Sequence, residues 1–181
     1  MFGFFSKPSS YVSVPEQIYG TVVAQARNPD FFSVLNVPDS VMGRFDVLSL
    51  HVYLVSRRMK LEGSTKALNL SQEIFDHFMA DIDRALRELG IGDTTVPKRK
   101  KAMAKSFYGQ IADFDSAMDT GNSEELVIKV GDRFFPIETG ERGNAEALSN
   151  YMLRSESFLS GQTIERIYGG QIEWPKEVVV S

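Results

Sequence analysis

The sequence predicts an all-α protein, a single-domain bundle of about six to eight helices with a short extended C-terminal tail. Apolar residues recur at helical spacing through nearly all of its 181 residues. Capping residues, glycines and prolines separate the periodic segments, and no internal linker is long enough to divide the chain. We therefore expect an N-terminal tail at 1–14, one helical domain at 15–175 and a C-terminal tail at 176–181.

Three helices are predicted in the first third of the chain. The first spans about 15–26 and begins at Pro15, because proline favours the first helical turn. Asn28-Pro29 predicts the capped start of a short helix that ends near residue 36. The stretch VPDS then interrupts the pattern, and Asp39 or Ser40 caps a long helix that ends near residue 61.

Two long helices follow, each with a clear end. Ser64 caps a helix that runs to about residue 89 and ends at Gly90. The next helix begins at Asp93, Thr94 or Thr95 and ends near residue 119, before a Thr-Gly pair.

The rest of the chain is predicted to be mostly helical, and one segment fits either a helix or a strand. Residues 123–135 alternate like a strand at Leu126, Ile128 and Val130, but Leu126, Val130 and Phe134 also fit a helix. Both interpretations remain open. Residues 144–159 and 163–168 are predicted helices, and the stretch GGQIEWP is predicted to be extended.

Composition excludes several classes of protein. The chain has no cysteine, which excludes disulfides and thiolate chemistry. Its net charge of −4 argues against DNA as a partner. No apolar run is long enough to span a bilayer, and the N-terminus does not resemble a signal peptide. Phe2, Phe4 and Phe5 either pack on the domain or form a shallow membrane or partner contact.

The predicted helix at 40–61 carries two apolar strips with a polar strip between them. Arg44, His51 and Arg58 form this polar strip, seven residues apart. One interpretation is an internal network of paired charges, with Asp39 and Asp46 as candidate partners of Arg44. The other is a groove that binds a ligand or peptide, because binding sites combine apolar walls with a few polar groups.

The predicted helix at 64–89 has an apolar face wider than one neighbouring helix requires. Phe75 and Phe78 lie within this face. We expect the helix to contact several neighbours, or a neighbour and a bound partner.

Four bases, Lys98, Arg99, Lys100 and Lys101, stand at the start of the following helix, and Lys105 comes one turn later. Positive charge there opposes the helix dipole, at about 0.3–1 kcal/mol per charge. One interpretation is a contact with anionic lipid, ribosomal RNA or acidic client loops. The other is an ordinary solvated helix end.

The sequence contains no recognisable catalytic motif. HExxH, P-loop, GxGxxG and GxSxG patterns are absent, and the chain has two histidines, His51 and His77. Glu73, His77 and Asp81 have a spacing that could hold a metal, but a solvated helix face explains them more simply. We expect no enzyme activity, no metal and no cofactor.

Two blocks of the sequence resemble the ubiquinol–cytochrome c chaperone family. The first block carries Tyr19, Arg27, Pro38-Asp39, Gly43-Arg44-Phe45-Asp46 and Leu50-His51. The second carries Arg87-Glu88-Leu89-Gly90, Asp93, Val96, Lys100 and Tyr108-Gly109. Together they cover roughly residues 18–115. The chain begins almost directly at the domain, as the α-proteobacterial members do.

The resemblance implies a non-catalytic assembly chaperone that binds newly synthesised cytochrome b during assembly of respiratory complex III. Other implied partners are the ribosome or an anionic membrane surface, and a small partner subunit. The implied location is cytoplasmic and peripheral to the bacterial inner membrane, or on the matrix side of a mitochondrion. The alternative function is a peripheral membrane or lipid-binding helical module.

The resemblance and the two wide apolar helices together predict two sets of contact residues. Expected client contacts are Asp39, Arg44, Phe45, Asp46, His51, Val55, Arg58, Phe75, Phe78, Arg87, Glu88, Asp93 and Tyr108. Expected ribosome or lipid contacts are Lys98, Arg99, Lys100, Lys101 and Lys105.

Overall fold

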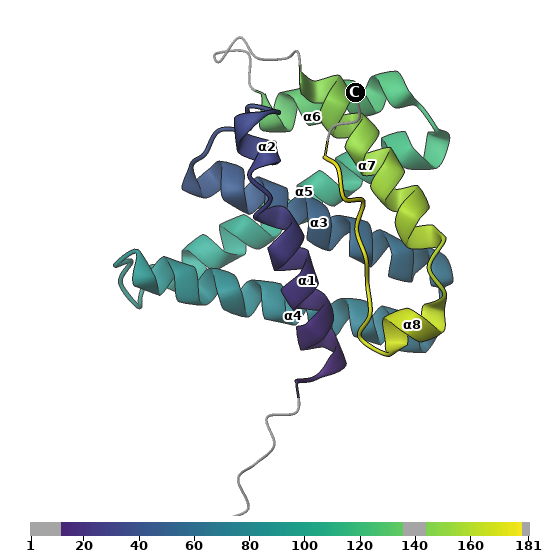
Figure 1. Ribbon diagram of the computed structural model, residues 1–181. Coiled ribbons are helices and arrows are strands. Elements are labelled where there is room, and N and C mark those ends of the chain that lie inside the picture. Colours follow the sequence, from purple (N-terminus) through teal and green to yellow (C-terminus); the bar gives the residue numbers. More distant parts are fainter. Residues whose placement is uncertain (1–11, 136–143, 179–181) are drawn as a thin grey trace, which may run out of the picture.

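The computed structural model describes residues 12–135 and 144–178 (Figure 1). Over these residues the chain forms helices and no strands, so the predicted all-α class is confirmed. The helices are α1 (Val14–Ala26), α2 (Asp30–Ser33), α3 (Val41–Glu62), α4 (Thr65–Glu88), α5 (Val96–Thr120), α6 (Ser123–Phe134), α7 (Ala145–Ser160) and α8 (Ile164–Tyr168). The N-terminal phenylalanines and the two ends of the predicted tails lie outside the described residues, and the domain boundaries stay a prediction.

Side-chain caps mark the starts of four of the eight described helices, α1, α3, α4 and α6. Ser40 caps α3 by accepting a hydrogen bond from the Gly43 N–H at 3.1 Å, and Ser64 caps α4 in the same way. Of the two caps considered for α3, the structure therefore selects Ser40 over Asp39. Thr95 precedes α5 without a side-chain cap.

The segment at 123–135 is helical. Asn122 caps α6 by accepting from the Glu125 N–H at 3.1 Å, and acidic residues in the first turn favour the positive end of the helix dipole. Leu126 and Val130 are buried while Ile128 is 57% exposed, which is the spacing of one helix face.

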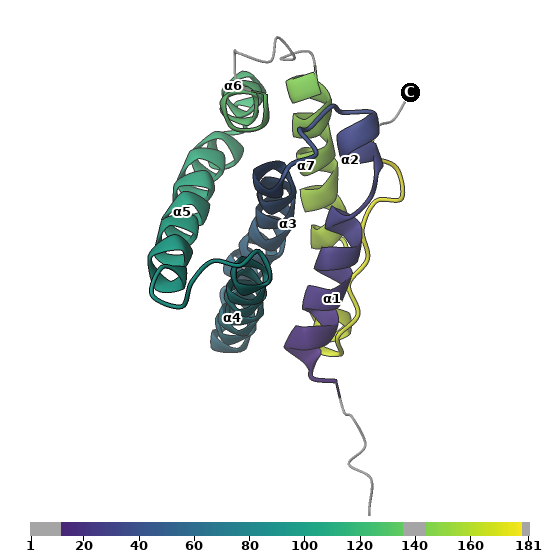
Figure 2. The ribbon, with the colours of Figure 1, turned by 90° about the vertical axis from the view of Figure 1, so that its left-hand side faces the viewer.

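The helices are arranged in three layers, visible edge-on in Figure 2. The antiparallel pair α3 and α4 forms the middle layer. On one side, α1 contacts both of them and α7 contacts α3. On the other side, α5 packs on α4 and leads into α6, which packs on α7. The wide apolar face of α4 is explained, because this helix contacts α1, α3 and α5.

Helix α3 is the centre of the molecule, with 13 of its 22 residues buried. Its first turn lies directly against the preceding loop. A Cβ atom added to Gly43 would lie 1.9 Å from the carbonyl oxygen of Pro38, so only glycine permits this contact. The close approach holds the Pro38-Asp39 turn against the start of α3, beside Arg44.

The C-terminal segment runs extended along the bundle, as predicted. Gln162 holds it with two hydrogen bonds of 2.9 Å, one to the Glu173 carbonyl and one from the Glu173 N–H. Trp174 lies against the ring of His51, and Val178 is buried. No helix of the described part is both long and apolar enough to cross a membrane.

Candidate functional site

A groove of about 440 Å³ opens between α1, α3 and the C-terminal half of α4. We call it the α1/α3/α4 groove. Phe45, Ile82 and Leu86 are almost fully buried beneath it, while Val41 and Leu89 are more than half exposed at its edges. Its lining residues are Val23, Ala26, Arg27, Val41, Arg44, Phe45, Leu48, Asp81, Ile82, Ala85, Leu86, Glu88, Leu89 and Met103.

Charged side chains stand on the rim of this groove. Arg44 has its Nε 2.6 Å from Asp39, and its guanidinium lies over the Phe32 ring at 5.0 Å. Both members of this ion pair are more than half exposed, so the pair contributes little to stability. Arg27 and Arg44 also border a second depression that contains Phe32 and Asp39. The charged rim can therefore contact a bound partner without breaking a strong internal pair.

The predicted polar strip on α3 does not form one surface. Of its three members, Arg44 lines the groove. Arg58 is held inside by Glu62 and by the carbonyls of Leu159 and Gln162. The ligand-groove interpretation therefore fits Arg44, and the internal-network interpretation fits Arg58 and His51.

His51 is fully buried and has a partner for each ring nitrogen. Its Nδ1–H donates to the Val47 carbonyl at 2.7 Å, so Nε2 accepts from the Tyr151 hydroxyl at 2.8 Å. Burial lowers the pKa of His51 to about 4. The side chain has no path to a partner in this conformation, since Phe31 and Trp174 also cover it.

Other predicted contacts are also placed inside the fold. Val55 and Phe78 are core residues with no exposed surface. Asp46 does not pair with Arg44, because its carboxylate is 2.5 Å from Arg133 of α6. Burial raises the pKa of Asp46, although the Arg133 charge opposes this. These positions stabilise helix packing and do not reach the groove surface.

At the far end of α4, charged residues connect it to α5. Asp83 accepts from Arg87 at 2.6 Å and lies 3.1 Å from Lys100, and Arg87 also bonds Asp93. Hydrogen bonds from Arg87 and Lys100 lower the pKa of Asp83. One of the predicted cations, Lys100, therefore has a structural partner.

The other four bases of this cluster form no ion pair with any described residue. They are Lys98, Arg99, Lys101 and Lys105, all exposed. Among the contacts predicted near this end of α4, Glu88 lines the α1/α3/α4 groove. The charge of these four bases is therefore available to a partner.

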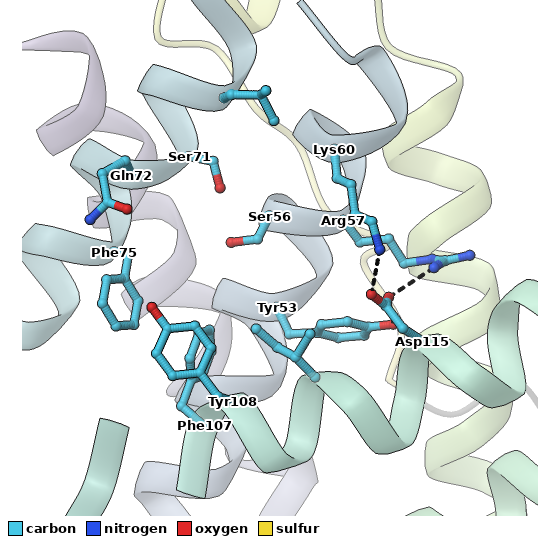
Figure 3. Close-up of a pocket in the computed structure, with 12 residues that line it drawn as sticks. Tyr53, Ser56, Arg57, Lys60, Ser71, Gln72, Phe75, Phe107, Tyr108 and Asp115 are labelled. Carbon is cyan, nitrogen blue, oxygen red and sulfur yellow. Dashed lines mark hydrogen bonds and ion pairs between the residues drawn. The ribbon is translucent and has the colours of Figure 1, made fainter. Parts of the chain in front are cut away.

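A second cavity, of about 310 Å³, lies between α3, α4 and α5, and we call it the α4/α5 pocket (Figure 3). The predicted contacts Phe75 and Tyr108 lie here with ring centroids 5.6 Å apart. Tyr108 is 56% exposed. At the opposite end of the close-up, Asp115 receives hydrogen bonds from Arg57 and Lys60.

Arg57 is the centre of a buried ion-pair network that the sequence did not indicate. Its side chain is 6% exposed, and its guanidinium bonds Asp115, Asp119 and Glu156 at 2.9, 2.7 and 2.5 Å. Burial alone would lower the pKa of Arg57, but the hydrogen bonds that its guanidinium donates to the carboxylates outweigh this effect, and the pKa lies above its usual value. The network joins α3, α5 and α7.

The possible metal ligands Glu73, His77 and Asp81 do not form a metal site. Asp81 accepts from the Tyr19 hydroxyl at 2.9 Å and from Arg84, and His77 stacks on the Tyr19 ring. No group of three or more His, Cys, Asp or Glu side chains that could hold a metal occurs within 12–135 and 144–178.

Sequence reasoning missed the residues that α1 and α5 contribute to the groove. Val23 lies on α1, Arg27 directly follows the end of α1, and Met103 lies on α5. Helical spacing shows which face of one helix is apolar, but not which parts of it a neighbour leaves uncovered.

Comparisons with known proteins agree with this architecture. A family model described as ubiquinol-cytochrome C chaperone matches residues 33–174. The crystal structure of the Cbp3 homolog from Brucella abortus matches with a TM-score of 0.81 and 37% sequence identity, over 91% of this chain and 90% of that chain.

Curated relatives match over much of the chain at lower identity. Ubiquinol-cytochrome c reductase complex assembly factor 1 of Mus musculus is 24% identical over 160 residues, or 87% of this chain and 53% of that protein. The protein of the same name from Homo sapiens is 24% identical over 160 residues, or 87% of this chain and 52% of its own length. The chain thus spans about half the length of the curated relatives it matches.

Proposed function

Because this chain belongs to the ubiquinol-cytochrome C chaperone family, we propose that it assists assembly of ubiquinol–cytochrome c reductase by binding an unassembled subunit, without catalysis. We infer that this client is newly synthesised cytochrome b, whose apolar segments need cover before they reach their partners. The protein then works at the inner face of the bacterial inner membrane, or at the matrix face in a mitochondrion.

The observation that carries this proposal is the α1/α3/α4 groove. It combines a buried apolar floor with exposed apolar edges at Val41 and Leu89. Exposed apolar surface of this kind typically marks a site of interaction with protein or membrane. A helical segment bound in a groove uses a few apolar anchors spaced three or four residues apart. The charged rim, with Arg44 and Glu88, is suited to orienting the segment through its polar flanks.

The α4/α5 pocket is less suited than this groove to be the main client site. Its charged end is already occupied, because Asp115 is bonded by Tyr53, Arg57 and Lys60. A partner there would have to compete with these internal contacts. The ion pair on the groove rim is solvated and costs far less to rearrange.

Photo-crosslinking at the groove edge tests the proposal. A photoreactive amino acid at Leu89 or Val41, in cells that translate cytochrome b, is expected to crosslink to cytochrome b. Val55 and Phe78 are unsuitable positions because they are core residues. The matched control is Ile128, equally exposed but on α6 and outside the groove. Equal crosslinking from Ile128 and Leu89 would contradict the proposed site.

A charge test of the same groove supplies a magnitude. Replacing Val41 and Leu89 with glutamate is expected to reduce capture of cytochrome b at least about tenfold, or about 1.4 kcal/mol of binding free energy. Both side chains are more than half exposed, so the fold should be retained. The control is Ile128→Glu. Undiminished capture by the double variant would show that the client binds elsewhere.

We further propose that the basic end of α5 contacts an anionic surface, either ribosomal RNA or an anionic membrane. The supporting observation is that Lys98 and Arg99 have no ionic partner in the described part of the chain. If membrane binding were the main activity, the protein would be the alternative lipid-binding module. A small partner subunit stays a prediction.

Reversal of two charges separates these surfaces. Lys98→Glu with Arg99→Glu is expected to weaken the relevant association at least about tenfold at low salt, since each base near an anionic surface contributes about 1 kcal/mol. Sedimentation with purified ribosomes and with anionic vesicles identifies which one binds. Lys66→Glu with Arg166→Glu makes the same change in net charge elsewhere and should have little effect. Equal weakening by both pairs would indicate a general charge effect and no basic site.

A further inference from the structure

Charges along α5 run in the direction that its helix dipole disfavours. Bases occupy the first ten residues, from Lys98 to Lys105, and acids occupy the last eight, at Asp113, Asp115 and Asp119. The dipole is stabilised by acids near the start of a helix and by bases near its end. Local helix stability therefore does not explain this order of charges.

Six residues of α5, four of them charged, form one stripe on the outward face of the helix. The stripe contains Lys101, Lys105, Tyr108, Ala112, Asp115 and Asp119, with alternating spacings of four and three residues. At 100° per residue they fall within about 80° of the helix circumference, away from the buried Phe107 and Phe114. This is the spacing of a coiled-coil seam. All but Asp115, whose side chain is 15% exposed, are exposed, and α5 lies at the outside of the molecule (Figure 2).

The stripe is complementary to itself when reversed. Lys101 and Asp119 are equally distant from residue 110, and so are Lys105 and Asp115. An antiparallel second copy of α5, centred on residue 110, therefore brings base opposite acid at both ends of the contact. At the middle it brings the large Tyr108 opposite the small Ala112.

We propose that this face of α5 pairs with the same face of a second copy of the chain in a two-fold symmetric, antiparallel dimer. A two-fold interface uses one patch on both subunits, so each charge pair is formed twice. Gly109 is exposed beside the seam. Apart from its chain neighbours and the nearby backbone of its own helix, no atom lies within 4 Å of where its Cβ would be, so the two backbones can approach closely there.

The internal pairs of the acidic half decide how strong this dimer is. Asp115 is already bonded by Arg57 and Lys60, so the pair of Lys101 with Asp119 of the second copy contributes most. Asp119 uses one oxygen for Arg57 and is 56% exposed. Around Arg57, three carboxylates face two bases, which leaves one negative charge for the second copy to meet. Because these charges are solvated, the dimer is weak and sensitive to salt.

Crosslinking through introduced cysteines tests the register, and the chain has no cysteine of its own. Lys101→Cys and Asp119→Cys chains of different tag length are mixed at low salt and treated with a short bis-maleimide. The expected product is the mixed dimer. Two copies of residue 101 lie about 27 Å apart along the axis at 1.5 Å per residue, beyond the reach of the linker. Crosslinks in statistical proportions, or none, would overturn the proposal.

Sedimentation velocity tests the charges independently of that chemistry. The unaltered chain is expected to show a dimer that grows with concentration and decreases with salt. Lys101→Glu with Lys105→Glu should weaken it at least tenfold, and mixing with an Asp119→Lys chain should restore association. A monomer at all concentrations, or a dimer unaffected by the lysine variant, would reject the pairing. Client capture at Leu89 should be unchanged, which separates this result from the proposed function.

Discussion

Replacing Arg57 with leucine is expected to lower the free energy of unfolding by about 3 kcal/mol, because breaking a buried ion pair leaves a carboxylate without its partner. Arg57 is 6% exposed and joins Asp115, Asp119 and Glu156. Asp115, itself 15% exposed, would keep Lys60 and Tyr53 but lose the guanidinium that connects three helices. Urea unfolding at neutral pH measures the loss.

The matched control for this experiment is Arg44→Leu on the same helix. Arg44 also pairs with an aspartate, but both side chains are more than half exposed, so the expected loss is below about 1 kcal/mol. Adding Glu156→Gln to Arg57→Leu should restore part of the stability, because it removes a carboxylate that Arg57 alone neutralises. Equal losses for Arg57→Leu and Arg44→Leu would show that the network does not stabilise the fold.

Acidification from about pH 6.5 to pH 4 is expected to cost the fold about 3 kcal/mol through His51 alone. The unfolded chain takes up a proton near the ordinary histidine pKa of about 6.5, whereas burial lowers the pKa of His51 to about 4 in the folded protein. Protons therefore bind the unfolded state first, and stability falls as the pH falls through this window. Below about pH 4 both states are protonated and the loss stops growing.

Urea unfolding at several pH values measures this effect by comparison with His51→Asn. The asparagine variant should be less stable at pH 7, because Val47 and Tyr151 lose a well-placed partner. Its stability should nevertheless fall less between pH 6.5 and pH 4. His77→Asn retains His51 and should keep the pH dependence. If His51→Asn and the unaltered protein have parallel pH profiles, the buried histidine does not titrate as described.

The replacements of Arg57 and His51 also distinguish residues that stabilise the fold from residues that contact the client. Arg57 and His51 lie in the fold beside neighbours from α5 and α7, and neither lines the α1/α3/α4 groove. Their loss should reduce the amount of folded protein without changing which residues contact the client. Val41 and Leu89 should behave in the opposite way, since they are exposed at the groove edge and contribute little to the core.

The sequence alone determined the helices and their ends. Helical spacing placed α1, α3, α4, α5 and α7 within a few residues. The predicted cap Ser64 is the one that the structure uses, and Ser40 is one of the two caps predicted for α3. These signals are local, because a cap or a breaker acts on the backbone within a few residues of itself. The segment that became α6 was left open because its apolar residues fit two periods.

Tertiary structure alone decided which polar residues face a partner. Arg44, His51 and Arg58 share one strip of α3, yet the first lines a groove, the second is core and the third is held by α7 and its following loop. Val55 and Phe78 were predicted client contacts because they are apolar residues on amphipathic helices, whereas the exposed Leu89 was not among the predicted contacts. Which of them is covered depends on the neighbours that pack against α3 and α4, and that packing is set by contacts between residues far apart in the sequence.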